Sequence, residues 1–138
     1  MVDVIEGGCL CGQVRYQTTC MDSSFRVNCH CRDCQKLSGG PYVSLMGVPE
    51  ASFSASGEAN CFEHEGGSGN KIKAYCCTVC NSRVYGRPEI AKGLIFILAS
   101  SLDNPDLYRP NVDVFVHQAL PWDTMDESLP KVEGAFQR

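Results

Sequence analysis

Seven cysteines stand in three tight clusters that could bind metal ions. The clusters are Cys9-Leu-Cys11, Cys29-His-Cys31-Arg-Asp-Cys34 and Cys77-Thr-Val-Cys80. Zinc prefers tetrahedral coordination by thiolate or imidazole, and a structural zinc site takes all four ligands from the protein. The first and third clusters together supply four ligands. We therefore expect Cys9, Cys11, Cys77 and Cys80 to form a closed structural zinc site that joins the first strand to a later hairpin.

The middle cluster is one ligand short of a closed site. Cys29, Cys31 and Cys34 lie within six residues of one another. Catalytic zinc usually has three protein ligands and leaves its fourth position to water or substrate. This cluster therefore predicts a second zinc ion, open for chemistry, and a total of two zinc ions per chain. The remaining cysteines, Cys20, Cys61 and Cys76, stand apart and are interpreted as ordinary thiols.

Other ligands could change this assignment. A histidine could close the second site, and the candidates are His30, His64 and His117. His64 is the best of the three, because His30 lies between two ligands and would point away. Cys76 could also replace Cys77, although the two-residue spacing of Cys77 and Cys80 is the commoner metal-binding geometry.

The rest of the sequence favours metal binding over disulfide bonds. Ten of the 138 residues are cysteine, yet the N-terminal residues do not have the pattern of a secretory signal. We expect a cytoplasmic location, where thiols stay reduced. The longest apolar run, 94–99, is too short to span a membrane. A net charge of −4 and the lack of a basic cluster argue against nucleic acid as a partner.

The elements that must position the cysteines are mostly short strands. We predict a mainly β, antiparallel fold with short helices, in one domain covering residues 1–138. The only helix-like segment is 32–37, with a further turn within 123–129. Gly7-Gly8, Gly39-Gly40-Pro41, 66–69 and Asn104-Pro105 are interpreted as turns. The predicted strands are 13–18, 25–29, 42–48, 51–55, 60–65, 71–76, 83–86, 94–99 and 112–117.

The cysteine motifs, taken in order, resemble those of a known family. Residues 7–16 read GGCLCGQVRY, 29–39 read CHCRDCQKLSG, 75–82 read YCCTVCNS, and Pro121-Trp122 and the ESLP of 127–130 follow. This pattern is similar to the glutathione-dependent formaldehyde-activating enzyme family, which also includes centromere protein V. The resemblance implies a β-tent fold with two zinc sites. It assigns Cys9, Cys11, Cys77 and Cys80 to the structural site, and Cys29, Cys31 and Cys34 to the catalytic site.

The sequence departs from the family pattern at two positions in the third motif. Asn81 stands where a glycine is usual. Among the residues other than glycine, asparagine is the best suited to a left-handed backbone turn. Cys76 stands where an aromatic residue is usual, with Tyr75 one position earlier. We expect the metal site to survive both changes.

A zinc ion held by three thiolates is suited to activating a further thiol. The ion is soft and lowers the pKa of a bound thiol. We therefore predict that a small thiol becomes the nucleophile. The substrate pair, a thiol such as glutathione and an aldehyde such as formaldehyde, is implied by the family resemblance alone. The enzyme would be a carbon–sulfur lyase. Arg32 and Lys36 could offset the negative charge of the site, and Ser38 and Gly39 could present backbone N–H groups to a substrate or simply end the helix.

Two other functions use the same residues. A zinc-stapled interaction module with no catalytic activity would need both zinc sites only for structure. A redox protein would use Cys-x-x-Cys for disulfide exchange, but the thioredoxin type requires a βαβ context that this sequence lacks. The sequence leaves open the thiol, the electrophile and the oligomeric state.

Overall fold

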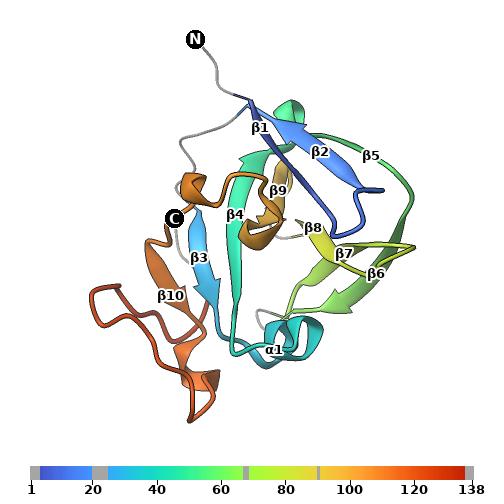
Figure 1. The fold of residues 1–138 in the computed structure, drawn as a ribbon. Helices are drawn as coiled ribbons and strands as arrows, with labels where there is room; N and C mark the ends of the chain where they lie inside the picture. The colour runs from blue at the N-terminus through green and yellow to red at the C-terminus, as the bar shows by residue number, and fades with distance from the viewer. Residues whose placement is uncertain (1–3, 20–24, 67–68, 90, 136–138) are drawn as a thin grey trace.

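Two β-sheets form the framework of the protein. The computed structural model describes residues 4–19, 25–66, 69–89 and 91–135. The smaller sheet has the order β1-β2-β5 and contains β1 (Ile5–Gly8), β2 (Arg15–Thr18) and β5 (Ser54–Ser56). The larger sheet has the order β10-β3-β4-β9-β8-β7-β6 (Figure 1). Its strands are β3 (Arg26–Cys29), β4 (Val43–Pro49), β6 (Ala59–Glu65), β7 (Lys71–Cys77), β8 (Arg83–Pro88), β9 (Leu94–Leu98) and β10 (Val112–Val114).

The prediction of a mainly β fold is confirmed, with one difference in strand direction. Neighbouring strands of the described residues pair antiparallel, except that β10 pairs with β3 in parallel. Parallel neighbours need a long crossover rather than a tight turn. Here the chain leaves β9, in the middle of the sheet, and reaches the edge beside β3 through residues 99–111, so this edge has one parallel pair in an otherwise antiparallel sheet.

Each face of the larger sheet carries its own apolar cluster, because side chains alternate along a strand. On β9, Ile95 and Ile97 are fully buried in the cluster that packs against the smaller sheet, together with Ile5 and Tyr16. Phe96, on the other face of the same strand, packs against the second cluster. That second cluster contains Val27, Leu45 and Val114, and it also contains the three cysteines of the middle motif.

The short helix α1 (Arg32–Ser38) follows the middle cysteine motif, close to the predicted 32–37. Cys31 caps its N-terminus by accepting a hydrogen bond from the Cys34 N–H at 3.3 Å. Gly39, with φ of 79°, ends it in the left-handed region that glycine adopts freely. Four 3₁₀ turns complete the described elements: η1 (Glu50–Ser52), η2 (Ala99–Ser101), η3 (Pro105–Leu107) and η4 (Val116–Gln118).

Three local predictions were wrong. Gly7 and Gly8 do not form a turn but lie in β1, where a Cβ on Gly7 would be 2.3 Å from the Tyr16 hydroxyl oxygen. These glycines therefore serve close packing. The predicted strand 51–55 is divided between η1 and β5, and 112–117 ends as a strand at Val114, because Phe115 has φ of 55°. The predicted turn at 66–69 lies partly outside the described residues.

Candidate metal centres

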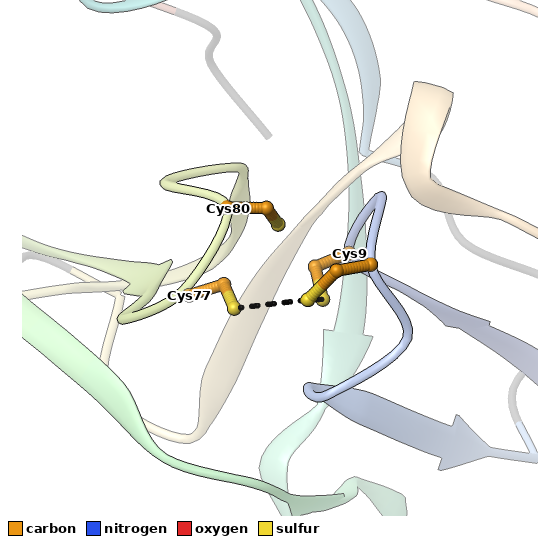
Figure 2. A group of neighbouring side chains, drawn as sticks. Cys9, Cys77 and Cys80 are labelled. Carbon is orange, nitrogen blue, oxygen red and sulfur yellow. Dashed lines mark hydrogen bonds between the residues drawn. The ribbon is translucent and has the colours of Figure 1, made fainter.

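The first and third cysteine clusters meet at one point between the two sheets. The sulfur atoms of Cys9, Cys11, Cys77 and Cys80 all lie within 4.8 Å of one another. Figure 2 shows Cys9, from the loop after β1, pointing towards Cys77, which ends β7, and Cys80, from the turn that follows. The Cys9–Cys11 and Cys11–Cys77 sulfur distances are 3.6 and 3.7 Å. Four thiolates about 2.3 Å from a tetrahedral zinc ion would be about 3.8 Å apart, so this donor set fits zinc.

Backbone N–H groups hold the sulfur atoms of this group in place. Val14 donates to the Cys9 sulfur at 3.2 Å, and Val79 donates to the Cys77 sulfur at 3.3 Å. The Ser82 side-chain hydroxyl, 3.2 Å from the Cys80 sulfur, lowers the pKa of that thiol to about 5, helped by the Ser82 backbone. These contacts stabilise thiolates and orient them before any ion binds.

The two departures from the family motif keep this group intact. Asn81 has φ of 63°, the left-handed conformation expected for it, and its N–H donates to the Cys77 carbonyl at 3.0 Å. Cys76 is not in the group, and Cys77 is. Tyr75 stacks on Tyr85 with ring centroids 4.6 Å apart, which gives the shifted aromatic residue a packing partner.

The middle motif forms a second group of sulfur atoms. Those of Cys29, Cys31 and Cys34 lie within 4.8 Å of one another, and all three residues are buried. Cys29 ends β3, Cys31 caps α1 and Cys34 lies in its first turn, so a strand end and a helix start bring them together. No histidine, aspartate or glutamate of the described residues belongs to this group.

Three thiols this close together cannot all ionise without a cation. Hydrogen bonds from Cys29 and then Cys34 strongly lower the pKa of Cys31. The same contact with Cys31, followed by that with Cys34, raises the pKa of Cys29 well above its ordinary value. One cysteine of the group is thus favoured as a thiolate, and its negative charge opposes the ionisation of a second. A bound divalent cation would remove this opposition, so the group has the character of a metal ligand set.

The three-cysteine group opens on a cavity of about 440 Å³, whereas the four-cysteine group lies away from it. Cys29, Cys31 and Cys34 all line this cavity. Much of the remaining wall is apolar and includes Phe25, Phe96 and Leu45. The two metal groups therefore differ in access, one joining the sheets and the other facing an open space.

The histidines take different positions around this site. His30 is 1% exposed and points away from the ligands, as expected from its place between them. Its Nε2 lies 2.8 Å from an Asp113 oxygen and its Nδ1 lies 2.6 Å from an Asp123 oxygen. His64 lines the cavity, but its nitrogens lie outside the group of mutually close ligand atoms. His117 is exposed and contacts the Glu133 carbonyl.

The polar residues expected around the site lie elsewhere or have other partners. Ser38 and Gly39 are exposed at the end of α1, where Gly40 N–H donates to the Ser38 hydroxyl oxygen at 3.1 Å, and neither lines the cavity. Arg32 is exposed and contacts Gln35, and Lys36 is exposed on the same helix. A substrate-binding role for Ser38 and Gly39 stays a prediction.

Sequence reasoning missed Arg83, which lines the cavity beside the three cysteines. Its Nε and Nη1 are buried, and neither has a hydrogen-bond partner among the described residues. Its positive charge favours the thiolate forms of Cys34 and Cys76. The signal in the sequence was only an arginine three residues after Cys80, the last of the clustered cysteines, at the start of a strand.

The fold and the sites define a class: a mainly β protein with one group of four cysteines and one of three, each of which could hold a metal ion. The family model for glutathione-dependent formaldehyde-activating enzyme matches residues 4–118. The chain belongs to this family. No helix in the described residues has the length and apolar character needed to cross a membrane.

Individual relatives are more distant. Proteins of Aspergillus flavus and Aspergillus oryzae, provisionally named glutathione-dependent formaldehyde-activating enzymes, are each 27% identical over 134 residues, which is 94% of this chain and 69% of theirs. A crystal structure of a Rhodobacter sphaeroides protein aligns with a TM-score of 0.58 at 17% identity, covering 76% of this chain and 96% of that one. The likeness to the Rhodobacter sphaeroides structure shows a shared fold alone.

Proposed function

We propose that the protein is a zinc-dependent carbon–sulfur lyase. It adds a small thiol, such as glutathione, reversibly to an aldehyde such as formaldehyde, as a single domain covering residues 1–138. Cys9, Cys11, Cys77 and Cys80 hold a structural zinc ion, and Cys29, Cys31 and Cys34 hold the catalytic one. The observation that carries this proposal is that only the three-cysteine group lines the cavity. Family membership supports the thiol and the aldehyde.

The chemistry needs a thiolate beside a carbonyl carbon. When bound, zinc held by three thiolates supplies a fourth position at which a small thiol loses its proton. The thiolate sulfur then adds to the aldehyde carbon, the electron pair of the C=O bond moves to oxygen, and that oxygen takes up a proton equivalent to the one released. The product is an S-hydroxyalkyl thioether, and the reverse reaction breaks the carbon–sulfur bond. The three buried cysteines would position the reaction at the end of the cavity.

Cobalt substitution tests thiol binding directly. We expect the thiolate-to-cobalt charge-transfer band of the cobalt-loaded protein to grow when glutathione is added, because a soft three-thiolate site favours sulfur over water. Cys34→Ala should change this response, and Cys61→Ala, which removes an exposed cysteine outside both groups, should not. An unchanged spectrum at millimolar thiol, together with no turnover of glutathione and formaldehyde, would reject the lyase.

The interaction module remains a second candidate for one specific reason. Leu10 and Val79 stand inside the first and third cysteine motifs and are 88% and 64% exposed. Large apolar side chains at that exposure are typical of contact surfaces. A protein that binds two zinc ions tightly, fails to exchange its fourth ligand and turns over no aldehyde would favour this function.

A further inference from the structure

The cavity beside Cys29, Cys31 and Cys34 is far larger than a one-carbon aldehyde requires. Its volume is about 440 Å³. Formaldehyde has two heavy atoms, and one water occupies about 30 Å³ of liquid. Cavities of about 300–1,000 Å³ are the size of sites that enclose drug-sized ligands. The volume therefore suits two substrates of which at least one has a substantial body, and the character of the walls indicates what kind of body that is.

The walls of this cavity indicate that the body is apolar. Phe25 and Phe96 stack with ring centroids 4.6 Å apart and an interplanar angle of 5°, and both face the cavity. Leu94 lines it next to them. A Cβ added at Gly47 would lie 3.0 Å from the Phe25 Cβ and 3.1 Å from a Leu94 methyl carbon, so the wall is packed firmly from behind. Such a wall offers little to the polar backbone and charged ends of glutathione.

The cavity is also elongated along the sheet. Arg83 pairs with Cys76 on β7, and His64 pairs with Ile72 on the same strand, four residues away. Four residues of strand span roughly 13 Å. Both Arg83 and His64 line the cavity, so it extends from the cysteine end towards the far end of β7.

The guanidinium of Arg83 stands at the cysteine end of the cavity. The buried Nε and Nη1 of Arg83 make no hydrogen bond within the described residues. A buried guanidinium is costly unless an anion accepts its hydrogen bonds. The other charged residues of the lining are Asp33, which is half-buried on α1, and Lys92, which is exposed.

We propose that the cavity binds an aliphatic or aromatic aldehyde larger than formaldehyde, its apolar body along the Phe25–Phe96 wall and its oxygen at Arg83. This inference rests on the proposed function, because it identifies the electrophile of that reaction. The oxygen gains negative charge as the thiolate adds to the carbonyl carbon. Arg83 is placed to donate hydrogen bonds to it until it is protonated.

Binding of unreactive analogues tests this without turnover. We would titrate zinc-loaded protein with acetate, butanoate, hexanoate and octanoate by calorimetry, with hexanol as a neutral probe. Each methylene that enters the cavity should strengthen binding about fourfold. Arg83→Met should weaken hexanoate tenfold or more and leave hexanol nearly unchanged, because only the carboxylate uses the guanidinium.

Arg87→Met is the matched control. Arg87 lies on the same strand, but it pairs with Glu50 and lies over the Tyr75 ring, outside the cavity. Its variant should bind the series as the unmodified protein does. Affinity that is independent of chain length, which is the pattern of simple carboxylate coordination, would overturn the proposal. So would an Arg83→Met protein that binds hexanoate as tightly as Arg87→Met.

Turnover assays distinguish a failure of this inference from a failure of the proposed lyase function. Formaldehyde turnover with glutathione, combined with no chain-length effect, would keep the lyase and reject the larger substrate. A chain-length series that depends on Arg83, without turnover of formaldehyde or hexanal, would reject the lyase and keep the ligand class of the cavity. Turnover of hexanal with a higher kcat/KM than formaldehyde would support both.

Discussion

Replacing His30 with leucine should destabilise the protein severely, although His30 is no metal ligand. The side chains of His30, Asp113 and Asp123 are each 1% exposed. Lys131 lies 2.7 Å from the second oxygen of Asp113. The two ring nitrogens of His30 and the Lys131 ammonium thus lie within hydrogen-bonding distance of these two buried carboxyl groups. This network fixes the motif between Cys29 and Cys31 to the C-terminal part of the chain.

The size of the effect follows from which group loses its partner. Asp113 would keep Lys131, but Asp123 would lose His30, and its other oxygen already has no partner within the described residues. A buried carboxylate without compensation costs about 3–5 kcal/mol when its partner is removed. That is a large part of a typical stability of about 5–15 kcal/mol. For a domain of this size it lowers Tm by roughly 10–20 °C.

Urea unfolding of zinc-loaded protein under reducing conditions would measure this loss. His117→Leu is the control, since His117 is exposed and its removal should change the free energy of unfolding by less than about 0.5 kcal/mol. Adding Asp123→Leu to His30→Leu should recover much of the loss, because removing both partners leaves no buried charge unpaired. A His30→Leu protein that loses less than about 1 kcal/mol, or a double variant that recovers nothing, would refute this reasoning.

The metal sites give three further expectations. Elemental analysis of protein made with adequate zinc should find close to two zinc ions per chain, and one or none would contradict the ligand sets. Cys9→Ala and Cys80→Ala should leave insoluble or unfolded protein, because structural zinc contributes about 10–16 kcal/mol in zinc-finger peptides. Cys34→Ala should stay folded by circular dichroism with weakened zinc at the second site, and equal collapse of both kinds of variant would mean that the second site is structural as well.

Cysteine spacing predicted the metal groups well because it is a local property with a geometric consequence. A Cys-x-x-Cys turn brings two sulfurs to one side of the backbone in almost any fold, so the pairs could be read before the strands were placed. The strands themselves were predicted to within a few residues where apolar and polar residues alternate, as in β2, whose side chains alternate between buried and more exposed. β1 was missed because Gly7 and Gly8 resemble a turn, and only the position of Tyr16 explains why they must be glycine.

The cavity could not be predicted, because its residues come together only through the sheet order. Phe25 and Phe96 are 71 positions apart in the sequence, and they stack because β3 and β9 both flank β4. In the sequence, Arg83 is an ordinary residue at the start of a strand. Its position beside the cavity depends on the pairing of β8 with β9. The sequence pointed instead to Arg32 and Lys36, the cations nearest the motif, and both are exposed on α1. Proximity along the chain was a poor guide to charge at the site.

The different access of the two metal groups follows from where the fold places them. The four-cysteine group joins a loop of the smaller sheet to a turn of the larger one, so all its ligands are used in holding two layers together. The three-cysteine group lies on the opposite face of the larger sheet, where no second sheet covers it within the described residues and the space is a cavity instead. His64 also lines this cavity, and its strand partner lies four residues along β7 from that of Arg83. Its nitrogens are outside the group of mutually close ligand atoms. The proposed function requires this arrangement, because a substrate can take the fourth zinc position only where no protein ligand already holds it.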